Sequence, residues 1–460
     1  MRYGLLVPRY GHEVVGGTEH WLRLLCEHLV ADRGWSVDVF TTCAVSAATW
    51  ADEYPPGTTE VAGVRVHRYR SQSGRNAEYL HQMGRLRRDP TAYTREEAMA
   101  YIRLVGPVCP DATGAAEAAL ASGACDLVAV TPYLYWPTVT AVPVLGRRVV
   151  LHGAAHDEPE LYLPVMAEVY RSVGGFAFNS FSERELVEHN FAVGHLPSSV
   201  IGNAVDEGRG DPGTTRQALG LAPDEPFALC VGRVERAKGT IALAAMWDLY
   251  CRRRSGPRHR LVLLGPIHDE VPPRDSVIAT GRQPEEVKWG ALAACELLVA
   301  PSAQESFSLV VLEAWLAGSA GLPGPSRSAG LGGSAGLGGS AGLGGSAGLG
   351  GSAGLGGSAG LGGSAGLSGS AGAGRPVFVN GRCGPTVEHC RRSGGGIWYH
   401  DYGDFEVGLD RLLGDSGLRD ELARGGNAYA REQFAWPAIL DRYEELAARV
   451  LARAGAEARF

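Results

Sequence analysis

The stretch that decides the fold is Leu297-Leu-Val-Ala-Pro-Ser-Ala-Gln-Glu305-Ser-Phe-Ser-Leu-Val-Val-Leu-Glu313-Ala-Trp-Leu-Ala-Gly318. It begins with an apolar run typical of a buried strand, continues into a turn that carries Glu305, and ends in a helix that carries Glu313. Eight residues of helix separate two carboxylates by about 12 Å, which is about the span of an extended nucleotide sugar. Such spacing is common on surface helices, so its weight comes from the strand before it and from a second motif upstream.

The second motif lies at the end of another apolar run, residues 227–231, and has the sequence Gly232-Arg233-Val-Glu-Arg-Ala-Lys238-Gly. A glycine after a buried strand lets the backbone approach a ligand, and the next helix directs its N-terminus at the same place. Arg233 can bind phosphate oxygens through its planar guanidinium, and Lys238 adds a compact charge. Lys238 and Lys288 are the only lysines in the chain, which argues against the alternative of a solvated surface turn.

With these two motifs the chain resembles the retaining glycosyltransferases of the GT-B fold, most closely glycosyltransferase family 4. The resemblance runs in family order over nearly the whole chain, apart from one insert. Four further segments carry it: a glycine-rich first loop, a histidine loop, the end of the first domain, and the approach to the second acidic motif. They are Gly16-Gly-Thr-Glu19, His156-Asp-Glu-Pro159, Val200-Ile-Gly-Asn-Ala-Val-Asp206 and residues 281–302.

The resemblance implies a role for each motif residue. Arg233 and Lys238 stabilise the charge that develops on the departing phosphate, in place of a metal. Glu305 and the following backbone amides hold the donor sugar, and Glu313 accepts hydrogen bonds from the ribose. His156 donates to a sugar hydroxyl, with His152 as the competing candidate. The expected catalytic residues are Glu305, Arg233, Lys238 and His156. The expected donor-binding residues are Gly16, Gly17, Gly232, Ser306, Phe307, Ser308, Leu309 and Glu313, and no metal ligand is expected.

Strands alternate with helices along the chain, which predicts an α/β protein of two doubly wound, Rossmann-like domains facing a central cleft. We expect an N-terminal, acceptor-side domain over residues 1–205 and a C-terminal, nucleotide-sugar-binding domain over 206–435. The amphipathic stretch 436–460 is expected to form a helix that crosses back to the first domain. Residues 76–105 predict a helical excursion, either a solvated helix or an extension toward the acceptor.

A Gly/Ser/Ala/Leu-rich insert occupies residues 319–374 and contains six copies of Ser-Ala-Gly-Leu-Gly-Gly from Ser328 to Gly363. Removing it joins Gly318 to Arg375 and restores the family's helix–turn–strand sequence. Because half of each hexad is glycine, a flexible coil is expected rather than a β-helix of period six. The insertion point is a helix-to-strand turn, which lies at the end of a parallel sheet away from the ligand cleft. The site should therefore survive.

Composition excludes several classes of protein. The net charge of −7 argues against a general nucleic-acid binder, and the nine cysteines lack metal-ligand spacing and suit a reducing cytoplasm. No signal peptide and no window of about 18 apolar residues is evident. The chain is therefore expected to be cytoplasmic and without a transmembrane segment, while peripheral contact with the inner face of the membrane stays open.

Together these features predict an enzyme that moves a sugar from a nucleoside-diphosphate-sugar donor to a glycan, lipid-linked or other hydroxyl acceptor. Retention of anomeric configuration and a role in cell-surface polysaccharide assembly are what the resemblance implies. No cofactor and no metal are expected, since no Asp-x-Asp motif follows a strand. Two alternatives stay open: a nucleotide-sugar epimerase of the same fold, and an inactive binding protein disrupted by the insert.

Overall fold

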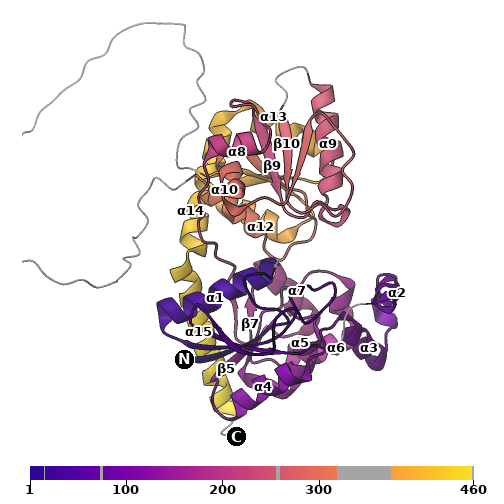
Figure 1. Ribbon diagram of the computed structural model, residues 1–460, viewed down its shortest axis with the longest axis vertical. Helices are drawn as coiled ribbons and strands as arrows, with labels where there is room; N and C mark the ends of the chain where they lie inside the picture. Colours follow the sequence, from indigo (N-terminus) through magenta and orange to yellow (C-terminus); the bar gives the residue numbers. More distant parts are fainter. Residues whose placement is uncertain (15, 73–75, 255–258, 319–373, 458–460) are drawn as a thin grey trace, which may run out of the picture.

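The computed structural model describes residues 1–460 except 15, 73–75, 255–258, 319–373 and 458–460. The repeat insert thus lies outside the described residues, apart from its last residue, Gly374. The described chain forms two α/β domains stacked end to end, and a long C-terminal helix runs beside the first domain (Figure 1). The predicted two-domain α/β fold is confirmed.

The first domain is built on a sheet with the strand order β3-β4-β2-β1-β5-β6-β7-β8. Its strands are β1 (Arg2–Leu6), β2 (Ser36–Thr42), β3 (Gly57–Val61), β4 (Val64–Tyr69), β5 (Leu127–Val130), β6 (Val149–Leu151), β7 (Gly175–Phe178) and β8 (Ser198–Val200). The expected parallel sheet is wrong at one edge, where β3 pairs antiparallel with β4. Ala62 and Gly63 connect the two strands with φ of 49° and 80°. Two consecutive residues of positive φ form the tight turn that a hairpin requires.

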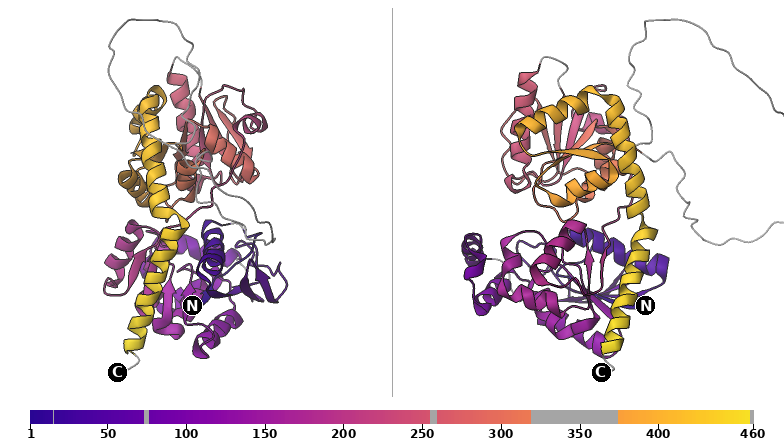
Figure 2. Two further views of the ribbon diagram at one scale, coloured as in Figure 1. Left: turned by 90° about the vertical axis from the view of Figure 1, so that its left-hand side faces the viewer. Right: turned by 180° about the vertical axis from the view of Figure 1, so that it is seen from behind.

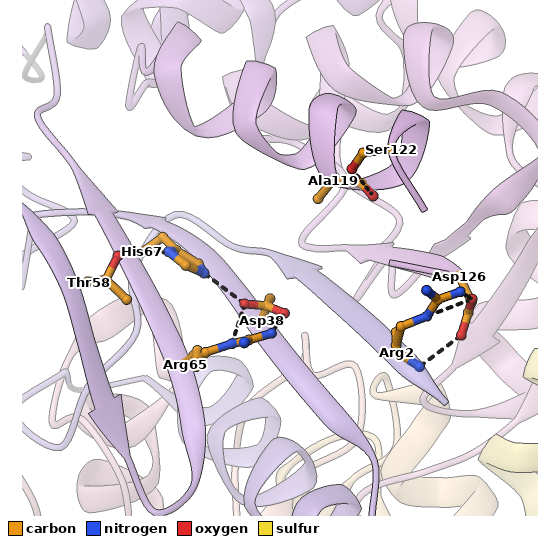
Figure 3. A network of polar contacts seen from close by, with 8 residues as sticks. All are labelled: Arg2, Asp38, Thr58, Arg65, His67, Ala119, Ser122 and Asp126. Carbon is orange, nitrogen blue, oxygen red and sulfur yellow. Dashed lines mark hydrogen bonds and ion pairs between the residues drawn. The ribbon is translucent and has the colours of Figure 1, made fainter. Parts of the chain in front are cut away.

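Polar side chains help to fix the register of this sheet, as Figure 3 shows. Asp38 on β2 stands opposite Arg65 on β4 and accepts two hydrogen bonds from its guanidinium, of 2.9 and 2.6 Å. His67 adds a contact of 2.8 Å to the same carboxylate. Burial works against the charge on Asp38, but Arg65 and His67 outweigh it and lower the pKa of the carboxyl group.

The second domain is built on a sheet with the strand order β11-β10-β9-β12-β13-β14, in which the strand pairs are parallel. Its strands are β9 (Phe227–Val231), β10 (Arg260–Leu264), β11 (Val277–Gly281), β12 (Leu297–Ala300), β13 (Val377–Asn380) and β14 (Gly396–Tyr399). In this doubly wound order, β9 and β12 are neighbours at the centre of the sheet. The strands that follow β9 are added on one side of the sheet, and those that follow β12 are added on the other side. Ligands bind in the crevice that forms where those two strands end.

Helices cover both sheets. Those of the first domain are α1 (Gly17–Arg33), α2 (Ala77–Leu86), α3 (Arg95–Val105), α4 (Pro110–Ala121), α5 (Trp136–Leu145), α6 (Pro164–Ser172) and α7 (Phe181–Phe191), with the 3-10 turns η1 (Pro90–Ala92), η2 (Gly146–Arg148) and η3 (Pro159–Tyr162). Those of the second are α8 (Pro212–Ala218), η4 (Arg236–Lys238), α9 (Thr240–Arg253), α10 (Glu285–Ala294), α11 (Leu309–Leu316), α12 (Gly384–Ser393), α13 (Tyr402–Gly414) and α14 (Ser416–Phe434). Side-chain hydrogen bonds favour the N-terminal ends of some helices. At the start of α3, for example, Thr94 and Glu97 form a capping box.

The last helix, α15 (Trp436–Glu457), follows α14 and crosses back to the first domain, where it packs on α1 and on strands β6 to β8 (Figure 2). Its Tyr443 hydroxyl lies 2.7 Å from the Tyr3 hydroxyl and 2.7 Å from His152 Nε2, all in the core. The crossing helix is therefore anchored in the first domain by a buried polar chain as well as by apolar contacts.

The two connections between the domains meet at one place. His28 of α1 stacks on Trp436 with ring centroids 3.8 Å apart, and its Nδ1 lies 2.6 Å from Asp32. Asp206 of the first connection accepts a hydrogen bond of 2.7 Å from Trp436 Nε1 and lies 3.6 Å from His28 Nε2. Burial opposes the charge on His28, but Asp206 and Asp32 outweigh it and raise the pKa of the imidazole. This arrangement links the first domain to both connections.

All nine cysteines are free thiols, and eight of them are buried. Among the residues that the structure describes, no helix combines the length and the apolar character needed to span a bilayer.

Candidate functional site

The candidate site lies at the switch point of the second sheet. Gly232 follows β9 directly, and Glu305 lies in the loop after the neighbouring strand β12. Gly232 has a φ of 140°, and among the described residues a Cβ added to it would meet nothing within 4 Å. Open space beside the backbone is what close approach of a ligand needs, and the predicted role of Gly232 in donor binding stays a prediction.

Lys238 and Glu305 meet at this switch point. Lys238 Nζ donates a hydrogen bond of 2.8 Å to Glu305 Oε1, although the two residues are 67 positions apart. Arg233 lies on the same loop as Lys238, is about half exposed, and forms an ion pair of 3.2 Å with Glu235. Two cations and a carboxylate thus lie on the loops that follow the neighbouring strands β9 and β12, and such a set of charges can bind phosphate and hydroxyl groups.

The second acid of the motif, Glu313, has a lysine partner of its own. Lys288 Nζ of α10 lies 2.9 Å from Glu313 Oε1 and 2.7 Å from Glu285 Oε2. The sequence had marked Lys288 only by the rarity of lysine, and its partnership with Glu313 was missed. The estimate of a 12 Å helical separation is also wrong, because Glu305 lies in the loop before α11 and only Glu313 lies on the helix.

The loop between β12 and α11 is held in a specific conformation. Asn380 donates a hydrogen bond of 2.9 Å to the Pro301 carbonyl. The Phe307 side chain is buried against His389 and Phe434, so this residue can reach a donor only through its backbone. Ser308 caps α11 with a φ of 73°, in the left-handed region that non-glycine residues rarely adopt. Backbone strain of this kind clusters at ligand sites.

The two candidate histidines differ sharply in their surroundings. His152 is buried in the core beside Tyr443, and burial lowers its pKa to about 3. His156 is only half-buried, and burial lowers its pKa as well. Glu305 and Lys238 lie close enough to act on the pKa of His156 with opposite signs. Of the two histidines, the structure places His156 of the first domain opposite Glu305 and Lys238 of the second.

A buried carboxyl group that sequence reasoning missed supports the His156 loop. Glu183, at the start of α7, accepts hydrogen bonds of 2.9 Å from the Ala155 amide and 2.7 Å from the Asn179 amide. Burial raises the pKa of Glu183 to about 7, although these amides favour its charged form. A half-buried carboxyl group of the His156 loop, Glu158, accepts a hydrogen bond of 2.6 Å from the Tyr133 hydroxyl, and burial raises its pKa to about 7. Glu183 has no sequence signature for this role, because its hydrogen bond to Ala155 joins positions 28 residues apart, whereas Glu158 belongs to the quoted histidine-loop motif.

The glycine-rich first loop lies beside the start of α11 of the second domain. Gly16 caps α1, where a Cβ would clash with Glu19, and Glu19 is paired with the buried Arg9. A Cβ on Gly17 would lie 3.9 Å from Leu309 Cδ1, at the start of α11. The N-termini of α1 and α11 therefore lie close together where the two domains meet, and both favour anions.

The predicted excursion at 76–105 consists of α2, η1 and α3 at the outer edge of the first domain (Figure 1). The Tyr101 hydroxyl of α3 donates a hydrogen bond of 2.9 Å to Glu160 of η3, the turn that follows the His156 loop. A groove of about 530 Å³ lies between α2 and α3. Its lining includes Glu78, Gln82, Arg85, Glu97, Met99 and Tyr101.

The comparison with known families bears on the second domain. Residues 212–322 match the family model of the glycosyl transferases group 1. The matched part of the chain contains Arg233, Lys238, Lys288, Glu305 and Glu313. A D-inositol 3-phosphate glycosyltransferase of Actinosynnema mirum is 30% identical over 204 residues, which are 40% of this chain and 49% of that protein. The chain thus spans about half the length of this curated relative.

Solved structures extend the likeness to the fold of the whole chain. A sucrose-phosphate synthase from Thermosynechococcus elongatus superposes with a TM-score of 0.65 at 18% identity, covering 98% of this chain and all of that one. HepE of Anabaena, in complex with UDP-glucose, gives 0.58 at 15% identity and covers 98% and 99%. At these identities the likeness concerns the fold alone. The protein has the GT-B fold, with two Rossmann-like domains.

Proposed function

We propose that this chain transfers a sugar from a nucleoside-diphosphate-sugar to a hydroxyl acceptor. The observation that carries the proposal is the pairing of Glu305 with Lys238, and of Glu313 with Lys288, at the switch point of the second sheet. This cluster lies within the segment that matches the glycosyl transferases group 1, and His156 faces it from the other domain. The same fold holds UDP-glucose in HepE.

In the proposed reaction the bond between the sugar C1 and the β-phosphate oxygen breaks, and a bond from C1 to the acceptor oxygen forms. Arg233 and Lys238 stabilise the negative charge left on the diphosphate, so no metal is invoked. Glu305 and the amides of residues 306–309 hold the sugar, Glu313 holds the ribose, and His156 donates a hydrogen bond to a sugar hydroxyl.

We propose that the anomeric configuration is retained, as in glycosyltransferase family 4, which the chain resembles. Attack then occurs on the face that the diphosphate leaves, and the acceptor proton passes to the departing phosphate oxygen. No protein nucleophile takes part. Closure of the two domains would exclude water and limit hydrolysis of the donor.

The acceptor would bind against the first domain, near His156 and the Gly16–Gly17 loop. Glycans, lipid-linked sugars and polyol phosphates are the classes to test, the last because of the name of the Actinosynnema mirum relative. Cytoplasmic location, peripheral membrane contact and a role in surface polysaccharide assembly belong to the same proposal. Flotation of the protein with anionic and neutral vesicles tests the membrane contact.

The deciding experiment measures thermal stabilisation and donor hydrolysis across uridine, guanosine and adenosine diphosphate sugars, with chelator and with added Mg²⁺. Stabilisation and slow hydrolysis by one donor, lost in Arg233→Ala and Glu305→Ala, support the transferase. Arg252→Ala is the matched control, since this exposed arginine lies near the C-terminal end of α9 and pairs only with Asp248 of the same helix among the described residues. A folded protein that responds to no donor overturns the proposal, and activity that requires Mg²⁺ overturns its metal-independent part. Release of an epimerised sugar identifies the epimerase alternative.

A further inference from the structure

Lys288 is held between two carboxylates on rigid elements. Glu313 on α11 lies 2.9 Å from its ammonium group, and Glu285, one turn earlier on α10, lies 2.7 Å away. The Lys288 and Glu313 side chains are only 15% and 14% exposed. Burial opposes the charge on Lys288, but Glu313 and Glu285 outweigh it and raise the pKa of the ammonium group. The ammonium group is therefore held in its charged form, and both side chains are shielded from bulk water.

The pair formed by Lys238 and Glu305 differs from it. Its side chains are 29% and 26% exposed, about twice as much, and both residues lie outside regular α-helices. In the proposed reaction Lys238 turns to the diphosphate and Glu305 to the sugar, so this pair exchanges partners when the donor binds. The helical positions of Lys288 and Glu313 favour a pair that persists in the complex.

A persistent pair still leaves Glu313 able to bind a ligand. An ionised carboxylate has about four acceptor positions, and Lys288 uses one of them on Oε1. The remaining positions can accept hydrogen bonds from two neighbouring hydroxyl groups. Lys288 thus fixes the orientation of the carboxylate without occupying it.

The pair also lies where the two domains approach each other. His20 of α1 is influenced by it: burial lowers the pKa of this histidine, the cations Arg23 and Lys288 lower it further, and Glu313 and Glu285 act in the opposite sense. Gly17, at the start of α1, faces Leu309 at the start of α11. A nucleotide bound at the N-terminus of α11 would therefore have the pair beside it.

We propose that Lys288 is a positioning residue that fixes Glu313 for the donor's ribose hydroxyls, and so sets the preference for ribose over deoxyribose. This inference rests on the proposed function, because it assigns a role within the same donor site. Lys288 acts through Glu313 and touches no reacting atom.

The test uses the full-length protein and calorimetric titration with UDP, GDP and ADP and their 2′-deoxy analogues. The wild type is expected to bind the ribonucleotide about 10- to 100-fold more tightly than its 2′-deoxy analogue. Lys288→Met is expected to weaken ribonucleotide binding at least tenfold, to leave deoxynucleotide binding nearly unchanged, and so to bring the ratio close to one. Lys288→Arg should keep most of the preference. Glu285→Gln, which removes only the exposed partner, is the matched control and should change the ratio less than threefold.

Unchanged discrimination in Lys288→Met overturns the inference, as does an equal loss of affinity for both nucleotide forms. Lys288→Gln serves if the methionine variant does not fold, because it keeps a hydrogen-bond donor without the charge, and its ratio should fall at least threefold. Failure of the wild type to bind any of the three nucleoside diphosphates overturns the proposed function itself, and this inference with it. Normal wild-type binding with unaltered variants overturns the inference alone.

Discussion

Lys238 donates a hydrogen bond of 2.8 Å to Glu305. The proposed function assigns Lys238 to the diphosphate and Glu305 to the sugar of one nucleotide-sugar, and in the protein without ligand these two side chains are partners. Lys288 pairs with Glu313 in the same way. The only two lysines of the chain are therefore the ion-pair partners of the two glutamates of one motif. Each pair keeps its lysine and its carboxylate hydrogen-bonded in the absence of a ligand, and in the proposed reaction only the more exposed Lys238–Glu305 pair exchanges partners when the donor binds.

Replacing Lys238 by methionine should lower kcat/KM for donor hydrolysis or transfer by about 10²–10³-fold, the usual effect of losing one donor to a developing charge. The melting temperature should change little, because the Lys238–Glu305 pair is partly exposed and such pairs contribute little to stability. Steady-state kinetics and thermal unfolding measure the two effects. Arg252→Met is the control, and equal rates in the two variants would contradict the role of Lys238.

His156 and His152 should separate function from stability. His156→Gln is expected to lower kcat/KM by about 10- to 100-fold with little change in melting temperature, because the half-buried ring lies near Glu305 and Lys238. His152→Gln is expected to lose about 1–3 kcal/mol of unfolding free energy, because Tyr443 loses one of its two buried hydrogen-bond partners and keeps only Tyr3. Kinetics and denaturant unfolding of both variants provide the comparison. The reverse pattern would move the catalytic role to His152.

The contacts of His28 with Asp206 and Asp32 should make the free energy of unfolding depend on pH. The folded protein has a raised pKa at His28, so its charged contacts with Asp206 and Asp32 stabilise fully below the unfolded pKa of about 6.5. This contribution is lost as the pH rises through the folded pKa. His28→Gln should therefore cost about 1.5–3 kcal/mol near pH 5.5 and less at pH 9, measured by denaturant unfolding. His81→Gln, at an exposed position of α2, is the control, and a cost independent of pH would argue that only the stacking on Trp436 matters.

Deleting residues 319–373 should preserve the fold and the site. The Arg375 amide donates a hydrogen bond of 2.8 Å to the Ala314 carbonyl. The chain segments before and after the insert are therefore already in contact. A direct Gly318–Gly374 junction shortens the connection from α11 to β13 about twelvefold, which should stabilise the protein by about 2 kcal/mol. Thermal unfolding and donor binding of the deletion variant measure this. Loss of donor binding in a folded deletion variant would show that the insert takes part in function.

The sequence determined the βα alternation, the two domains and the strand ends that carry the motifs. It could do so because buried parallel strands are continuous apolar runs, and because a motif after such a run lies at the ligand edge wherever the strand stands in the sheet. Gly232, Glu305 and Glu313 were located by this local pattern. The roles given to them stay predictions until a donor is tested.

The tertiary structure alone decided which groups meet. The pairing of Lys288 with Glu313, the support of the His156 loop by Glu183, and the burial of His152 beneath α15 join positions 25 to 291 residues apart. The antiparallel strand β3 likewise depended on a neighbour rather than on its own polar sequence. Such contacts follow from how helices pack on the two sheets and how α15 returns to the first domain. The local hydrophobic pattern of the sequence does not specify that packing. The sequence therefore identified the residues that could bind or react, and only the tertiary structure showed which side chains they contact.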